Sequence, residues 1–153
     1  MSSGKRSTSE KTDLNERLAT SGLRSTAQRE HVYQVLISNR DHPTAEEVFI
    51  RAKQEKPDIS MATVYNCLDA LVTCGLVKQV NLDRTATRYC SNLSEHCHFH
   101  CIECGRVFDI DLKKRPRIPE AQLPEGFEPE HVDISMRGHC PKSQCHNSSN
   151  HAA

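Results

Sequence analysis

The sequence has no tryptophan, few other aromatic residues and no net charge. Its 153 residues include four Phe and three Tyr, so aromatic residues make up 5% of the chain. Aromatic side chains carry much of the apolar area of a protein core, so each half of this chain must form a small core. The 20 basic and 20 acidic residues cancel, so no overall basic field points to a nucleic-acid partner.

Long apolar runs are also absent. No stretch approaches the roughly 20 apolar residues that a membrane-spanning helix needs, and the N-terminal residues lack the apolar core of a signal peptide. We therefore expect a cytoplasmic protein with no membrane partner. Disulfides are rare in that compartment, so the eight cysteines are interpreted as metal ligands or free thiols.

Three histidines and three cysteines lie within residues 96–104, HCHFHCIEC. Within this stretch lies the pair Cys101 and Cys104, and a second pair, Cys140 and Cys145, follows downstream. Four thiolates in two short clusters are typical of a closed structural zinc site. The alternative is four unrelated thiols, but two close pairs rarely arise by accident in a cytosolic chain.

The first half of the chain has strong helix signals. Residues 1–12 are polar and expected to be disordered, and Asp13 is expected to cap a short helix that ends at Thr20. Thr26 and Ser60 then cap predicted helices over 27–39 and 60–74. Between them, Thr44 and Glu47 form a capping box at the start of a helix that reaches residue 54.

Strand signals follow the helices. Residues 76–82 and 85–90 are expected to form a hairpin, and three helices followed by a hairpin is the order of a winged helix-turn-helix domain. The second half predicts strands over 99–102, 106–111 and 132–137. The fold class is therefore α+β, with a DNA-binding type of domain first and a metal-containing second half with three strands.

Motifs along the whole chain resemble those of one family of metal-sensing repressors. They occur in the family's order and spacing, as GLRSTAQR at 22–29, HPTAEE at 42–47, SMATVYN at 60–66, GLV at 75–77, HCH at 96–98, CIECG at 101–105 and GHC at 138–140. The chain thus resembles the ferric uptake regulator family over residues 13–146. The resemblance implies a winged-helix DNA-binding domain at 13–90, a hinge at 91–95, an α/β dimerisation domain at 96–146 and a flexible tail at 147–153. It also implies a homodimer that binds double-stranded, palindromic, A·T-rich DNA when its regulatory metal is bound.

The predicted DNA-reading helix starts at Ser60. The helical wheel places four residues on its outward face: Ala62, Thr63, Asn66 and Ala70. In the major groove, Asn66 would pair with adenine and Thr63 with a thymine methyl group or a phosphate. The resemblance adds Tyr65 as a base contact, although the wheel places it at the edge of the apolar stripe.

Three basic residues complete the predicted DNA site. Arg24 resembles a residue that relatives insert into a narrow A·T-rich minor groove. Arg29 and Lys78 are expected to contact phosphates. Outside the family context, each of them would be interpreted as a solvated surface charge.

The regulatory metal site is implied by the resemblance. In the family it draws ligands from both domains, and the matching residues here are His42, Cys90, His96, His98 and Asp109. A thiolate at position 90 is similar to zinc uptake regulators, whereas iron and peroxide sensors carry a carboxylate there. Cysteine and histidine donors favour Zn(II) over Fe(II) or Mn(II), whereas Asp109 favours a peroxide sensor.

Several alternatives stay open. The same scaffold would serve a peroxide- or iron-sensing repressor. A zinc-dependent hydrolase and a zinc ribbon that binds only protein are further alternatives, although no His-Glu-x-x-His motif is present. A third metal site of some relatives looks absent, because its positions hold Glu95, Cys97, Pro116 and Val132. The residues left without a role are Cys67, Cys74, Cys97, His100 and His131.

Overall fold

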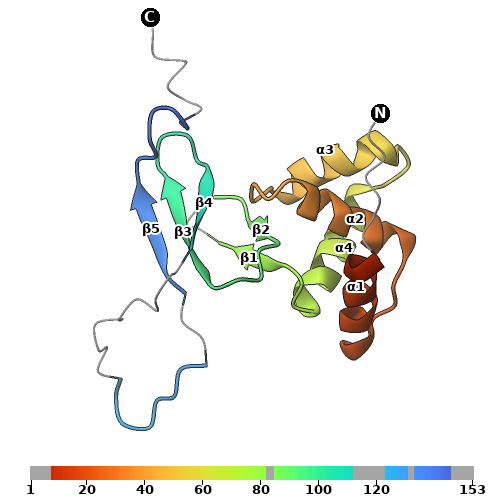
Figure 1. The fold of residues 1–153 in the computed structure, drawn as a ribbon, viewed down its shortest axis with the longest axis horizontal. Coiled ribbons are helices and arrows are strands. Elements are labelled where there is room, and N and C mark those ends of the chain that lie inside the picture. Colours follow the sequence, from red (N-terminus) through yellow and green to blue (C-terminus); the bar gives the residue numbers. More distant parts are fainter. Residues whose placement is uncertain (1–7, 82–84, 112–122, 131–132, 146–153) are drawn as a thin grey trace, which may run out of the picture. The chain divides into compact units, whose positions relative to one another are not determined.

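A computed structural model describes residues 8–81, 85–111, 123–130 and 133–145, with side chains from residue 12 onward. The chain divides into two compact units, Met1–Leu93 and Ser94–Ala153, and the division falls inside the expected hinge at 91–95. Among the described residues, the first unit contains four helices and a two-stranded sheet, and the second contains a three-stranded sheet (Figure 1). The search for membrane spans over the described residues finds no helix of sufficient length and hydrophobicity.

Helix caps define the helices of the first unit. Helix α2 (Ala27–Ser38) begins after Thr26, whose side chain accepts a hydrogen bond from the backbone N–H of Arg29. Helix α4 (Met61–Thr73) begins in the same way after Ser60. Helix α3 (Ala45–Glu55) begins with the complete capping box of Thr44 and Glu47. These three predicted helices are confirmed to within one or two residues at each end.

The first helix is longer than expected. Helix α1 spans Thr8–Thr20, so the prediction of disorder through residue 12 is wrong for 8–12, while residues 1–7 lie outside the described part of the chain. Asp13 does not cap this helix. Its carboxylate lies 3.2 Å from Nε of Arg17 one turn later, which stabilises the interior of a helix and not its start.

The buried side chains of this unit form one core. Leu14 and Leu18 of α1 pack with apolar residues from α2, α3 and α4, and the fully buried members include Val32, Leu36, Val48, Val64, Leu68 and Leu71. The buried aromatic residues of this core are two tyrosines, Tyr33 of α2 and Tyr89 of the hairpin, which agrees with the low aromatic content of the sequence.

The hairpin of the first unit is shorter than predicted. Strands β1 (Lys78–Val80) and β2 (Arg88–Cys90) pair antiparallel, with Lys78 opposite Cys90 and Val80 opposite Arg88. The predicted strand starts at 76 and 85 were wrong. The backbone N–H groups of Leu76 and Val77 instead donate to the carbonyl of Leu71, closing the end of α4 after Gly75 at φ 76°. The predicted turn at 83–84 lies outside the described residues.

The sheet of the second unit has β3 (His96–Cys101) in the middle. It pairs antiparallel with β4 (Val107–Asp111) and parallel with β5 (Ser135–Gly138). The prediction that this strand begins at Phe99 was wrong by three residues. His96, Cys97 and His98 have no strong strand preference of their own, but they extend the strand because each pairs with a residue of β4.

Alternation along β3 separates two chemistries. Successive strand side chains point to opposite sides of a sheet, so Cys97, Phe99 and Cys101 share one face with their partners Phe108, Ile110, Met136 and Gly138. We call this the cysteine–aromatic face. The opposite side, the histidine face, carries His96, His98 and His100 with their β4 partners Asp111, Asp109 and Val107.

The capping box at α3 gives a stability prediction. Thr44 Oγ1 accepts from the N–H of Glu47 at 3.3 Å, and Glu47 Oε2 accepts from the N–H of Thr44 at 3.0 Å. Thr44→Ala is expected to lower the free energy of unfolding by about 1 kcal/mol. The measurement is urea denaturation followed by helical circular dichroism. Thr73→Ala, at the exposed last residue of α4, is the matched control, and an equal loss in both variants would contradict a role for the box.

Candidate metal centres and nucleic-acid face

The structure brings the four predicted zinc-binding cysteines together. The sulfur atoms of Cys101, Cys104, Cys140 and Cys145 all lie within 4.8 Å of one another. Cys104 Sγ and Cys140 Sγ are 3.8 Å apart, and the backbone N–H of Cys140 donates to Cys101 Sγ at 3.4 Å. Three of the four cysteines are buried, with Phe99 and Phe108 packed against them.

Backbone geometry explains how residues far apart in sequence form this cluster. Cys101 ends β3 opposite Gly138 of the parallel strand β5, and the N–H of Ile102 donates to the Gly138 carbonyl at 2.9 Å. A β-carbon added at Gly138 would lie 3.2 Å from the ring of Phe99, so a larger residue there would require this ring to shift by a few tenths of an ångström. Gly105, at φ 70°, turns the chain back after Cys104.

The local electrostatics prepare this cluster for a cation. The backbone N–H groups of Cys140 and Cys104 lower the pKa of the Cys101 thiol to about 6, while burial raises that of Cys140. One sulfur is thus a ready thiolate, and bound metal would displace the protons of the others. Four sulfur donors in a compact, largely buried set fit a structural zinc ion.

A second group of metal-binding side chains lies on the histidine face. His96 Nε2 is 3.3 Å and His98 Nε2 is 3.4 Å from the same oxygen of Asp109, and the two imidazole nitrogens are 3.0 Å apart. The directly paired positions of His98 and Asp109 in β3 and β4 create this convergence. Two imidazoles and one carboxylate directed at one point can form half or more of a transition-metal site.

The other two predicted regulatory ligands lie together in the first unit. A ligand nitrogen of His42 and the sulfur of Cys90 are within 4.8 Å of each other, and both residues are buried. Strand β2 runs beside the turn that carries His42, because the N–H of Tyr89 donates to the Pro43 carbonyl at 2.9 Å and Thr44 forms an isolated bridge with Arg88.

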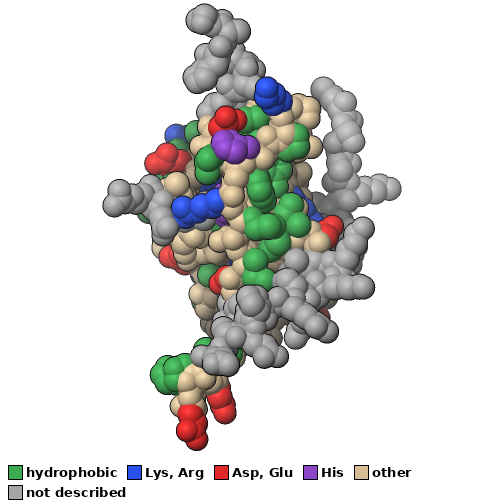
Figure 2. Space-filling view, turned by 90° about the vertical axis from the view of Figure 1, so that its left-hand side faces the viewer, with side chains coloured by type: hydrophobic (Ala, Val, Ile, Leu, Met, Phe, Trp, Pro, Cys, Tyr) green, Lys and Arg blue, Asp and Glu red, His purple; other side chains and the backbone are tan. Residues whose placement is uncertain are grey.

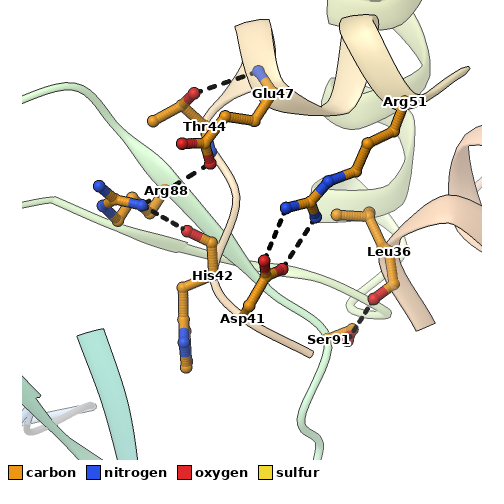
Figure 3. Close-up of polar contacts among 8 residues, drawn as sticks. All are labelled: Leu36, Asp41, His42, Thr44, Glu47, Arg51, Arg88 and Ser91. Carbon is orange, nitrogen blue, oxygen red and sulfur yellow. Dashed lines mark hydrogen bonds and ion pairs between the residues drawn. The ribbon is translucent and has the colours of Figure 1, made fainter. Parts of the chain in front are cut away.

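The turn at His42 has an unusual backbone. His42 has φ 56°, and among the described residues it is the only non-glycine at positive φ. The chain is held on both sides of it (Figure 3). Asp41 forms a two-pronged pair with Arg51 of α3 at 2.9 and 2.6 Å, and Arg88 Nη1 donates to the His42 carbonyl at 2.9 Å. The hydrogen bond from Arg51 lowers the pKa of Asp41, so this clamp stays charged under ordinary conditions.

Sequence reasoning did not identify Arg51 or Arg88 as functional. The sequence around an arginine does not indicate which distant residue its side chain contacts. The imidazole of His42 points away from the Asp41–Arg51 pair (Figure 3), so the clamp acts on the backbone of the turn and not on the ring.

Among the described residues, the cysteines and histidines to which the sequence assigns no role lie outside these groups. Cys67 of α4 and Cys74, the C-cap of that helix, are core residues, and burial raises the pKa of the Cys67 thiol. Cys74 Sγ donates to the Leu71 carbonyl at 3.4 Å. Cys97 and His100 are buried on opposite faces of β3. Glu95 is exposed, and the other positions of the third site, Pro116 and Val132, lie outside the described residues together with His131.

Helix α4 exposes most of the predicted DNA-reading residues. Ser60, Ala62, Tyr65 and Asn66 are exposed, with Tyr65 at 45%, which resolves its uncertain place on the wheel in favour of solvent. Thr63 is half-buried, and its hydroxyl lies 2.9 Å from that of Ser60. The placement of Ala70 on the outward face was wrong. It is 5% exposed and packs in the hydrophobic core of this unit.

The predicted basic contacts differ in their surroundings. Arg24 and Lys78 are exposed. Arg29 is half-buried, and its guanidinium donates to the backbone carbonyl of Arg24. Arg29 therefore holds the loop that carries Arg24, in addition to any phosphate contact it makes.

The cysteine–aromatic face of the second unit remains partly open. Figure 2 shows hydrophobic side chains gathered on the side of the molecule that it turns to the viewer. The exposed hydrophobic residues of this sheet are Ile110 and Met136, each 39% exposed, and Ile102 just after β3 is 62% exposed.

Comparisons with known proteins agree with one another. The model of the ferric uptake regulator family matches residues 20–137. The chain is similar to the peroxide-responsive repressor PerR of Staphylococcus aureus strain Mu50, with 32% identity over 136 residues, 86% of this chain and 92% of the relative.

Solved structures give the same result. The ferric uptake regulator of Pseudomonas aeruginosa with manganese is 26% identical, with a TM-score of 0.66 over 82% of this chain and 96% of that chain. The peroxide stress regulator of Campylobacter jejuni is 27% identical, with a TM-score of 0.60 over 90% of this chain and 99% of that chain.

Proposed function

The chain belongs to the ferric uptake regulator family, and from this premise we propose that it is a homodimeric, zinc-responsive transcriptional repressor. The observation that carries the zinc assignment is the buried thiol of Cys90 beside the imidazole of His42. Thiolate and imidazole donors together favour Zn(II), while sets of nitrogen and oxygen donors suit Fe(II) and Mn(II). The family relative named above is a repressor, which supports regulation over hydrolysis.

In this proposal two metal sites have separate tasks. Cys101, Cys104, Cys140 and Cys145 hold a structural zinc in the second unit. His42 and Cys90 from the first unit, with His96, His98 and Asp109 from the second, would supply the ligands of one regulatory ion. A site that takes ligands from both units favours one arrangement of the units, and that arrangement would favour DNA binding.

The surfaces of the two units support the remaining parts of the proposal. The exposed residues at the start of α4, including Tyr65 and Asn66, would read bases in the major groove. The exposed apolar side chains of the cysteine–aromatic face, Ile110 and Met136, suit a two-fold contact with a second copy of the chain. A two-fold dimer requires a palindromic operator.

Zinc-dependent DNA binding tests the proposal directly. With the four-cysteine site filled, raising buffered free Zn(II) is expected to tighten binding to a palindromic A·T-rich duplex by roughly 5–150-fold, the usual range of allosteric coupling. Fluorescence anisotropy at fixed salt measures the affinity, and Asn66→Ala, which keeps all metal ligands, should bind zinc normally and DNA weakly. A response to Fe(II) or Mn(II) without one to Zn(II) would refute zinc sensing.

Peroxide sensing is the second candidate, favoured by Asp109 and by the similarity to a peroxide-responsive repressor. Iron bound by His96, His98 and Asp109 would then catalyse oxidation of a ligand histidine. Peroxide treatment of iron-loaded protein, followed by mass spectrometry of His42 and His96, separates the candidates. Oxidation of either residue with loss of DNA binding would favour the peroxide sensor.

A further inference from the structure

We propose that Arg88 is a positioning residue that holds His42 in place for the regulatory metal and connects it to Cys90. The inference rests on the proposed function, because it assigns a task to a residue around those two ligands. Arg88 itself would not contact the metal. It would act through the backbone of His42.

The backbone of His42 needs such support. At φ 56° the β-carbon of a non-glycine residue crowds its own peptide groups, so the conformation persists only where neighbours hold it. Relaxation of His42 to negative φ would turn its imidazole in a different direction. The direction of the His42 imidazole therefore depends on a backbone conformation that histidine does not prefer.

The contacts of Arg88 provide that support. Its Nη1 donates to the His42 carbonyl at 2.9 Å and lies 3.8 Å from Oε2 of Glu47. The same Glu47 oxygen accepts from the N–H of Thr44 at 3.0 Å. Arg88 thus connects the carbonyl of His42 with the capping box of α3 (Figure 3). A planar guanidinium with five donors can serve a carbonyl and a carboxylate together, which the single ammonium group of lysine does less well.

The position of Arg88 in β2 connects both ligands. Arg88 and Cys90 are two residues apart in one strand, so they lie on the same face of the hairpin. Between them, the N–H of Tyr89 donates to the carbonyl of Pro43, the residue after His42. Strand β2 therefore carries both the thiolate ligand Cys90 and Arg88, the side chain that holds His42.

Charge alone predicts the opposite effect of removing Arg88. A positive guanidinium near a cation site repels the metal, so a neutral residue at 88 would tighten binding if electrostatics dominated. Loss of the contact to His42 would weaken binding. The sign of the change in metal affinity thus separates positioning from simple charge.

The test is the zinc affinity of the second site in the full-length protein, measured by chelator competition with the four-cysteine site filled. Arg88→Gln is expected to lower that affinity by about 10–100-fold, as loss of a partner that orients a metal ligand usually does. Arg40→Gln removes one positive charge from an exposed residue two positions before His42 and is the matched control. It should leave the affinity unchanged or raise it slightly.

A His42→Ala background distinguishes positioning from a general loss of structure. If Arg88 acts through His42, Arg88→Gln should cause no further loss of zinc affinity in that background. Should Arg88→Gln fail to fold, Arg88→Lys in both backgrounds gives the same comparison with a smaller expected loss. Equal losses in both backgrounds, or unchanged or tighter binding in the wild-type background, would overturn the inference. Wild-type protein that binds one zinc per chain would instead overturn the proposed function, and stoichiometry tells the two failures apart.

Discussion

Cys140→Ser is expected to release the structural zinc and to unfold the sheet of the second unit. Zinc binding and folding are the same event in small metal-stabilised domains, with apparent free energies of about 10–16 kcal/mol. The buried core around this cluster consists of Cys101, Cys140 and Cys145, with partly buried Phe99 and Phe108 beside it. Without the metal, little apolar area remains to hold β5 against β3. Zinc content by elemental analysis and hydrogen exchange of β3 and β5 measure the loss.

Cys97→Ser is the matched control for this experiment. Cys97 is buried on the same face of the same strand as Cys101, but it does not belong to the four-sulfur group. This variant should keep the zinc of the four-cysteine site and cost about 1–3 kcal/mol of stability, the usual cost of a poorly satisfied buried hydroxyl. Stoichiometric zinc and a protected sheet in Cys140→Ser would contradict the structural assignment of the cluster.

Cys90→Asp is expected to shift the metal response away from zinc. The substitution replaces the one thiolate of the proposed regulatory set with a carboxylate, a donor that suits harder ions. The loss of zinc affinity at this site should exceed the roughly 10–100-fold that loss of a ligand's hydrogen-bond partner causes. Relative affinity for Mn(II) should rise. Chelator competition for each metal and operator binding at buffered metal concentrations measure the two effects.

The four-cysteine zinc provides the internal control for Cys90→Asp. It should stay bound, because Cys90 belongs to the first unit and the cluster to the second. Cys90→Ser, which removes the thiolate without adding a charge, should lose zinc without gaining Mn(II). Zinc-dependent operator binding that survives Cys90→Asp would remove the main support for zinc sensing.

Local chemistry made much of the first unit predictable. Thr26, Thr44 and Ser60 each accept a hydrogen bond from a backbone N–H group at the start of a helix. Such capping residues can be recognised from the sequence alone. Asp13 shows where such reasoning fails. Aspartate both caps helices and forms ion pairs within them, and the start of α1 at Thr8 places Asp13 inside the helix, where it pairs with Arg17.

The four-cysteine group was predictable from spacing, whereas the geometry around His42 was not. The sequence places two cysteine pairs in one domain, and metal chemistry then brings them together. The positive φ of His42 has no signature, because histidine before proline is usually extended. The contact between Arg88 and the His42 carbonyl joins residues 46 positions apart, so it depends on how β2 lies beside the turn.

The alternation along β3 has a consequence for how this protein can change through evolution. Even-numbered positions 96, 98 and 100 serve the histidine face, and odd-numbered positions 97, 99 and 101 serve the cysteine–aromatic face. Under the proposed function, a mutation at position 96 or 98 would alter metal preference while the zinc cluster stays intact, so the two functions could diverge independently. Gain or loss of a single residue inside the strand would exchange the faces and disrupt both at once. We therefore expect lineages of this protein to vary β3 by substitution and to preserve its length.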